Sequence, residues 1–133
     1  MTKPIVLDSF ALIAYLRAEP AGAKVTAHLQ AAQAGKTRLF LSFINLAEVY
    51  YKTIREQGLD KGREVIAILR ALPIEIVSLS DEFTLRAAEV KAAHPMSFAD
   101  CFATALAQEK HASILTGDPE FKSVEKLVPI FRL

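Results

Sequence analysis

Short, largely apolar runs recur along the chain, and one or more longer segments of helical character separate each run from the next. The runs cover residues 5–7, 39–41, 74–77 and 113–116, with a weaker fifth run at 127–130. They do not alternate between apolar and polar residues, which is typical of parallel strands covered by helices on both faces. The pattern predicts an α/β fold, a three-layer α/β/α sandwich around a central, mainly parallel sheet of four to five strands.

The segments between these runs carry ordinary helix start and stop signals. Gly35 and Gly58 are typical C-terminal stops, and Pro129 favours a sheet edge for the last strand. We expect helices over residues 9–16, 21–34, 43–57, 60–72, 80–94 and 97–110.

Length and composition limit the class of protein. With 133 residues the chain predicts a single domain over 1–133, because two cores would leave both halves too small. The balance of 16 basic and 15 acidic residues excludes a charged tail of the block type. Cys101 is the one cysteine, which excludes a disulfide framework and fits a reducing compartment. The apolar run 10–16 is shorter than the roughly 20 residues that span a bilayer, so we expect a cytoplasmic protein with no membrane partner.

Several common catalytic motifs are missing from the sequence. The five glycines form neither G-x-G-x-x-G nor a Walker A loop, which argues against dinucleotide or P-loop nucleotide binding. There is no G-x-S-x-G elbow, and the three histidines lack the spacing of zinc ligands. Cys101 lies in an apolar helix, where it fits a small core residue.

Four carboxylates stand in apolar surroundings. Asp8 directly follows the first expected strand and Asp118 comes two residues after the fourth, and each also fits an N-cap of the next helix. Glu48 and Asp100 lie on helices whose other residues near them are mostly apolar, where an unpaired buried carboxylate is costly. Ligands collect at the carboxyl ends of the strands in such sheets, so we expect the four to converge there. Converging carboxylates repel one another unless a cation such as Mg²⁺ or Mn²⁺ lies among them.

The order of these motifs resembles the PIN-domain ribonucleases, and most closely the VapC-type toxins of type II toxin–antitoxin pairs. The residues that carry the resemblance are Val6–Ser9, Asn45–Val49, Ser97–Cys101 and Leu115–Phe121, the last similar to a closing T-x-D-x-x-F motif. Many relatives have threonine in place of Ser9. Phe10 is bulkier than the residue often found there, and we expect it to narrow the mouth of the cleft.

This resemblance implies a PIN-like domain that hydrolyses RNA with a bound divalent metal. Its metal-binding and catalytic residues would be Asp8, Glu48, Asp100 and Asp118, with Ser9, Asn45 and Thr116 in supporting positions. It also implies Mg²⁺ or Mn²⁺ as cofactor, RNA as substrate, a cognate antitoxin that blocks the pocket, and a homodimer. The cluster of Tyr50, Tyr51 and Ile54 fits either core packing or a groove for a partner.

Two other functions fit parts of the pattern. A catalytically inactive PIN-like binding module would share the fold, but all four acidic positions are filled. A phosphotransfer protein with Asp8 as nucleophile usually has a second aspartate two residues later, where this chain has Phe10. If the four acidic residues bind metal, eleven acidic residues remain against sixteen basic ones, which leaves a modestly basic surface around the site.

Overall fold

A computed structural model describes residues 2–133 and contains one sheet of five parallel strands. The strands are β1 (Ile5–Leu7), β2 (Leu39–Ser42), β3 (Glu75–Val77), β4 (Ser113–Thr116) and β5 (Ile130–Arg132). Their order across the sheet is β3-β2-β1-β4-β5. The expected α/β class and the parallel sheet are therefore confirmed.

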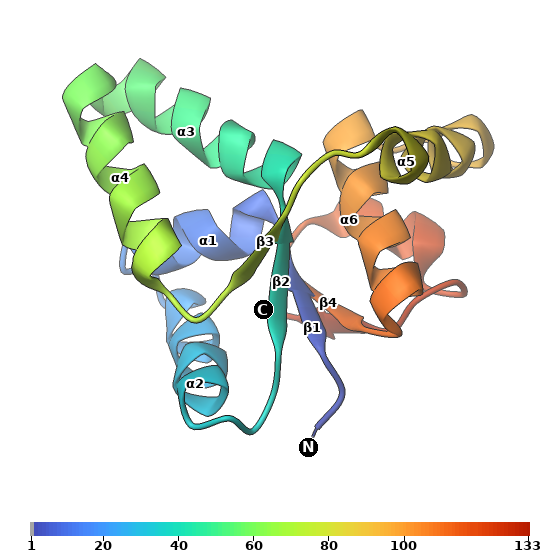
Figure 1. Ribbon diagram of the computed structural model, residues 1–133, viewed down its shortest axis with the longest axis horizontal. Coiled ribbons are helices and arrows are strands. Elements are labelled where there is room, and N and C mark those ends of the chain that lie inside the picture. Colours follow the sequence, from blue (N-terminus) through green and yellow to red (C-terminus); the bar gives the residue numbers. More distant parts are fainter. Residues whose placement is uncertain (1) are drawn as a thin grey trace.

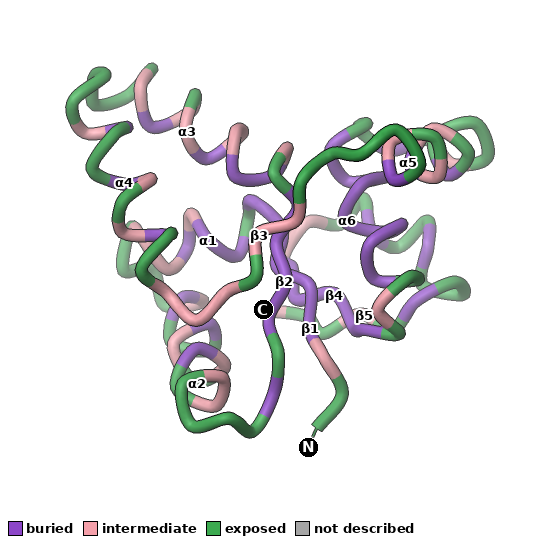
Figure 2. Tube along the Cα trace, viewed as in Figure 1, coloured by how far each residue is buried: buried purple, intermediate pink, exposed green. Residues whose placement is uncertain are grey.

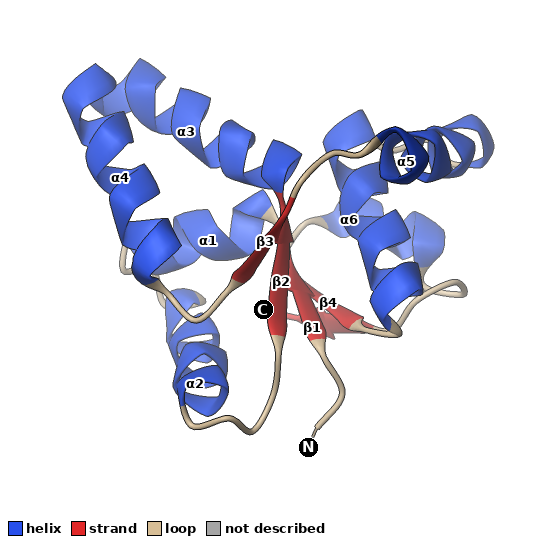
Figure 3. Cartoon of the chain, in the orientation of Figure 1, coloured by secondary structure: helices blue, strands red, loops and turns tan. Residues whose placement is uncertain are grey.

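Helices cover both faces of this sheet and complete the three layers (Figures 1 and 3). On one face lie α1 to α4, and on the other lie α5, α6 and the 3₁₀ helix η1. Their bounds are α1 (Ser9–Leu16), α2 (Gly22–Gln33), α3 (Phe43–Gln57), α4 (Leu59–Ala71), α5 (Asp81–Ala93), α6 (Phe98–Lys110) and η1 (Pro119–Val124). Among residues 2–133, no helix combines the length and the apolar character needed to cross a bilayer.

The two cores follow from the alternation of side chains along the short strands. Val6 is paired in register with Phe40 and Ile114, and all three pack on the side of α5 and α6. Leu7 and Leu41 point the other way, toward α1 to α4. Because both faces are covered, every residue of β1, β2 and β4 is buried (Figure 2).

Helix α6 is the most central helix. Nine of its thirteen residues are buried, so it cannot be an ordinary half-exposed surface helix. Cys101 is among the buried residues, which agrees with its expected place in the core. Small alanine side chains let this helix pack closely against β1, β2 and β4. Any polar residue on α6 is thereby carried into the interior of the protein.

The chain order of the strands creates a switch point at the centre of the sheet. From β1 the chain moves outward to β2 and β3, and it then returns to place β4 on the other side of β1. The chain therefore leaves β1 toward one face of the sheet and leaves β4 toward the other face. This divergence opens a crevice at the carboxyl ends of the two strands. In Figure 1 this is the upper edge of the sheet, where α3 and α6 begin.

The last strand lies later in the chain than the sequence predicted. It was expected at residues 127–130 but covers Ile130–Arg132, because the backbone N–H groups of Leu127 and Val128 still donate to the carbonyl of Val124. It is an edge strand, as Pro129 suggested.

The packing of α3 on α4 accounts for part of the cluster of Tyr50, Tyr51 and Ile54. Ile54 packs closely on α4, since a Cβ on Gly62 would lie 2.7 Å from Cγ1 of Ile54.

Candidate active site

Asp8 is the first residue after β1 and lies at the switch point. Its carboxylate caps α1, where Oδ1 accepts a hydrogen bond from the backbone N–H of Ala11 at 2.9 Å. Oδ2 accepts a hydrogen bond from the hydroxyl of Thr116, at the end of the neighbouring β4. Only 1% of Asp8 is exposed. The expected N-cap role and a position in the crevice therefore coexist in this one residue.

The segment after β4 places two more carboxylates at the same edge. The Thr116 hydroxyl accepts a hydrogen bond from the Asp118 backbone N–H at 2.9 Å, which turns the chain sharply after the strand. Asp118 then caps η1, with Oδ1 accepting from the N–H of Glu120 at 2.9 Å. Arg132 on β5 donates to the backbone carbonyl of Asp118 at 2.7 Å. These bonds fix both ends of a short acidic turn.

Asp100 reaches this turn from α6. Ser97 caps the helix by accepting a hydrogen bond from the Asp100 backbone N–H at 3.2 Å, which leaves the Asp100 side chain in the first turn. Carboxylate oxygens of Asp100, Asp118 and Glu120 all lie within 4.8 Å of one another. Asp100 is buried, Asp118 is half-buried and Glu120 is exposed, so the cluster opens to solvent on the side of η1.

Burial and mutual repulsion disturb the titration of these carboxyls. Loss of hydration, the charge of Asp118 and a hydrogen bond with Glu120 raise the pKa of Asp100 to about 8. Burial likewise raises the pKa of Asp8 to about 6, although the hydrogen bonds from Thr116 and Ala11 lower it. Without a cation, the Asp100 carboxyl therefore retains a proton near neutral pH.

Glu48 approaches from α3 through a chain of polar contacts. The Ser42 hydroxyl donates to Oδ1 of the fully buried Asn45 at 2.7 Å. Asn45 in turn donates from Nδ2 to Oε1 of Glu48 at 3.1 Å and to the backbone carbonyl of Ala99 at 3.5 Å. Asn45 therefore links Glu48 on α3 to the first turn of α6, where Ala99 is the residue before Asp100.

The structure thus brings Asp8, Asp100 and Asp118 to one edge, while Glu48 is outside the three-carboxylate cluster and is linked to the start of α6 through Asn45. Sequence reasoning missed Glu120, which takes part in the cluster, and Ser42, which orients Asn45. A signal for Glu120 was present, because it stands two residues after the capping Asp118, in the first turn of η1.

A divalent cation fits this group of side chains. The cluster offers only carboxylate oxygens, the ligands that Mg²⁺ and Mn²⁺ prefer. Because the three oxygens lie within 4.8 Å of one another, one cation could contact all of them. The ion pairs formed among residues 2–133 join other acidic groups, so no side-chain cation already neutralises the cluster.

The fold and site together define a class of protein: an α/β/α sandwich with an acidic crevice at the switch point of its sheet. A family model, the PIN domain, matches residues 5–127. The chain belongs to the PIN-domain family, as its motifs led us to expect. A comparison with curated proteins found no sequence match.

Solved structures of VapC-type toxins share this fold. The DNA-bound VapBC of Salmonella typhimurium has a TM-score of 0.76 at 15% identity, with 98% of each chain covered. VapBC2 of Rickettsia felis, bound to a promoter DNA fragment, has a TM-score of 0.74 at 17% identity, covering 96% of this chain and 97% of that one. VapC20 of Mycobacterium tuberculosis, a toxin that cleaves the sarcin–ricin loop, has a TM-score of 0.71 at 19% identity, covering 90% and 94%.

Proposed function

We propose that this protein is a metal-dependent endoribonuclease and the toxin of a toxin–antitoxin pair, with one domain over residues 1–133 carrying the whole function. The observation that carries the proposal is the convergence of Asp8, Asp100, Asp118 and Glu120 at the switch point of a PIN-domain fold, where no lysine or arginine of residues 2–133 forms an ion pair with them. The VapC20 neighbour, a toxin that cleaves the sarcin–ricin loop, supports RNA as the substrate class.

Each carboxylate has a role in this proposal. Asp100, Asp118 and Glu120 would hold Mg²⁺ or Mn²⁺ together with Asp8, whose two oxygens keep lone pairs beyond the bonds from Ala11 and Thr116. A bound divalent cation supplies charge neutralisation at the scissile phosphate and lowers the pKa of an attacking water.

The surrounding polar groups orient these carboxylates. Glu48, which accepts a hydrogen bond from Asn45, would either accept a proton from the attacking water or complete the metal site from α3. Thr116 holds Asp8 and the Asp118 backbone at once, so one hydroxyl sets the relative position of two carboxylates. Ser9 is buried beside Asp8 at the start of α1 and lines the adjoining pocket. Such supporting contacts commonly affect metal affinity by about 10–100-fold.

Cleavage of RNA by the purified chain tests this function. With Mn²⁺ or Mg²⁺ present, we expect cleavage of cellular RNA at defined positions, and we expect EDTA to stop it. Asp8→Asn and Asp100→Asn should abolish cleavage while retaining the wild-type circular dichroism spectrum. Unchanged cleavage by either variant would overturn the mechanism. A folded wild-type protein that neither binds Mn²⁺ nor cuts RNA would instead be an inactive PIN-like binding module.

The proposal also includes two protein partners. Solved neighbours are VapBC complexes, in which a toxin is bound to its antitoxin, so we propose a small antitoxin that covers the acidic crevice. An arginine or lysine of that partner would pair with the carboxylates and displace the metal. We further propose a homodimer. Light scattering at micromolar concentration checks the dimer, and co-purification with the product of a neighbouring gene checks the antitoxin.

A further inference from the structure

A pocket of about 320 Å³ lies directly beside the acidic cluster, between α1 and α3. This volume is within the range of small-ligand sites, about 300–1,000 Å³. Asp118 borders both the pocket and the cluster, so a ligand held at the cluster extends into the pocket. The other walls of the pocket come from Ser9, Phe10, Ile13, Arg17, Glu19 and Lys52.

The aromatic wall of this pocket rests on the backbone next to the site. A Cβ on Gly117 would lie 2.2 Å from Cε1 of Phe10 and 2.6 Å from its Cζ, so the ring occupies the space that any other residue would need. Gly117 is not among the residues with positive φ, which means that the ring and not the backbone conformation requires glycine here. The ring is thereby placed one residue from Asp118.

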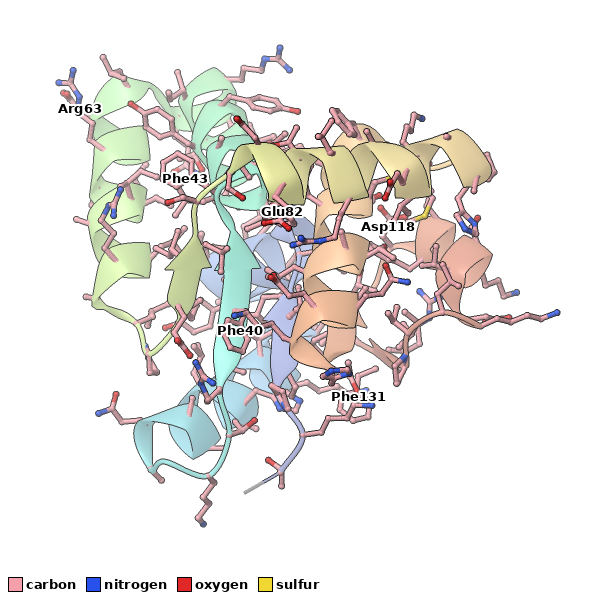
Figure 4. The ribbon with its side chains drawn as sticks, turned by 45° about the vertical axis from the view of Figure 1, so that its right-hand side comes forward. Phe40, Phe43, Arg63, Glu82, Asp118 and Phe131 are labelled. Atoms are coloured by element: carbon pink, nitrogen blue, oxygen red, sulfur yellow. The ribbon has the colours of Figure 1, made fainter. Side chains whose placement is uncertain are left out.

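Phe10 is nevertheless 42% exposed, although it is a large apolar side chain. One part of the ring contacts Gly117 and another borders the pocket. An aromatic ring held in this way, with a free surface toward a pocket, is a stacking platform of the kind that binds the bases of single-stranded nucleic acids. Exposed Phe131 provides a contrast, since it lies apart from Asp118 (Figure 4).

The pocket also contains an unengaged positive charge. Lys52 follows Glu48 by four residues on α3, so both side chains lie on the same side of that helix. Arg17 forms an ion pair with Glu56, whereas Lys52 makes none with the residues from 2 to 133. The ammonium group of Lys52 is therefore free to pair with a phosphate of a ligand that enters the pocket from the side of Asp118.

From this juxtaposition we propose that the pocket binds the nucleotide next to the scissile phosphate, with its base stacked on Phe10 and its distal phosphate paired with Lys52. The proposal rests on the proposed function and adds a base-stacking subsite beside the metal site, which a nucleotide can enter only when its base is unpaired. Since every base has an aromatic face, this subsite is expected to tolerate all four bases.

Binding measurements with two probes test the subsite. The first probe is a fluorescein-labelled pool of ten-nucleotide single-stranded RNAs, and the second is an oligomer of tetrahydrofuran phosphates of the same length, which has phosphates but no bases. Anisotropy is measured with Mg²⁺ in the Asp8→Asn background, so that the RNA stays intact. Matched controls are Phe131→Ala, another exposed phenylalanine, and Lys36→Ala, an exposed lysine in the loop before β2.

Each variant has a distinct expected result. Phe10→Ala weakens RNA binding about tenfold, as the loss of one stacked base predicts, and does not change binding of the base-free oligomer. Phe10→Tyr keeps wild-type affinity. Lys52→Ala weakens binding of both probes by a similar factor, because both carry phosphates. Phe131→Ala and Lys36→Ala stay within twofold of the parent protein.

Gly117→Ala extends the test to the support of the ring. It should weaken RNA binding in the parent but have no further effect in the Phe10→Ala background, because its effect acts through the displaced ring. The subsite is overturned if Phe10→Ala binds RNA normally, if it loses both probes equally, or if the parent binds no RNA. Cleavage by the wild-type chain is a separate measurement, so the proposed function can stand when the subsite fails.

Discussion

The hydroxyl of Thr116 donates a hydrogen bond to the carboxylate of Asp8, although the two residues are 108 positions apart in the sequence. The bond crosses from the end of β4 to the end of β1, which are adjacent strands in the sheet. The same hydroxyl accepts from the backbone N–H of Asp118. One side chain therefore couples the first carboxylate of the site to the turn that carries the last two.

Thr116→Val tests whether the hydrogen bonds of the Thr116 hydroxyl, and not only the packing of its side chain, join Asp8 to the Asp118 turn. Valine fills the same volume but leaves the Asp118 N–H and one Asp8 oxygen without a partner, which should lower the free energy of unfolding by about 1–3 kcal/mol. Urea unfolding measures the loss, and Thr116→Ser should restore most of it. The control is Thr53→Val, because the buried Thr53 hydroxyl bonds only to the carbonyl of Val49 within α3. If Thr116→Val and Thr53→Val lost the same free energy of unfolding, the coupling through Thr116 would be contradicted.

The raised pKa of Asp100 predicts that the metal-free protein loses stability as pH rises. Its folded-state pKa of about 8 is above the ordinary value of 3.8, so the folded protein binds more protons than the unfolded chain between these values. The free energy of unfolding therefore falls from about pH 4 to about pH 8. Asp100→Asn removes this titration, and its Tm in EDTA should exceed that of the wild type by at least about 4 °C at pH 8.

Two controls accompany that measurement. The gain from Asp100→Asn should shrink toward pH 5, where the wild-type carboxyl is still protonated in the folded protein. Asp60→Asn, on the exposed first turn of α4, should show the same Tm difference at both pH values. With Mn²⁺ in excess, the order at pH 8 should reverse, because only the wild type binds the ion fully. A gain from Asp100→Asn that does not depend on pH would contradict this account.

Much of the fold was predictable because the central strands are buried on both faces. Runs such as Val6–Leu7 and Leu39–Leu41 must be apolar throughout, which separates them clearly from the amphipathic helices. The serine and aspartate caps marked several helix starts for a similarly local reason. The last strand was misplaced because Pro129 ends a turn at that point, and the strand begins only after it.

Part of the site was predictable because a residue and its strand are neighbours in the chain. Asp8 comes directly after β1 and Asp118 two residues after β4, so the sheet alone places them, whereas Asp100 was predicted from its apolar surroundings on a helix. Glu120 is an exposed residue by local criteria, and its part in the site arises because α6 carries Asp100 to the same turn. The contact between Asn45 and the carbonyl of Ala99 has the same origin, since it depends on how α3 and α6 cross.

Glu120→Gln tests whether the structure rather than the motif defines the metal ligands. The substitution removes one charged oxygen donor from the three that lie within 4.8 Å, and should weaken Mn²⁺ binding about tenfold or more in calorimetry. Glu125→Gln is the matched control, because Glu125 follows η1 and is exposed outside the cluster. Wild-type affinity in Glu120→Gln would remove this residue from the proposed site.

Asn45→Leu tests the support of Glu48. Leucine has a similar size but cannot bond to Ser42, Glu48 or Ala99, and Asn45 is fully buried. Since Glu48 then loses its fixed orientation, we expect at least a tenfold fall in the rate of RNA cleavage. Mn²⁺ affinity should change less than it does in Glu120→Gln, because Asp100, Asp118 and Glu120 keep their positions. Urea unfolding should also show a loss of about 1–3 kcal/mol, because the buried Ser42 O–H loses the side-chain oxygen that accepts its hydrogen bond. A variant with normal cleavage and lowered stability would limit Asn45 to a structural role.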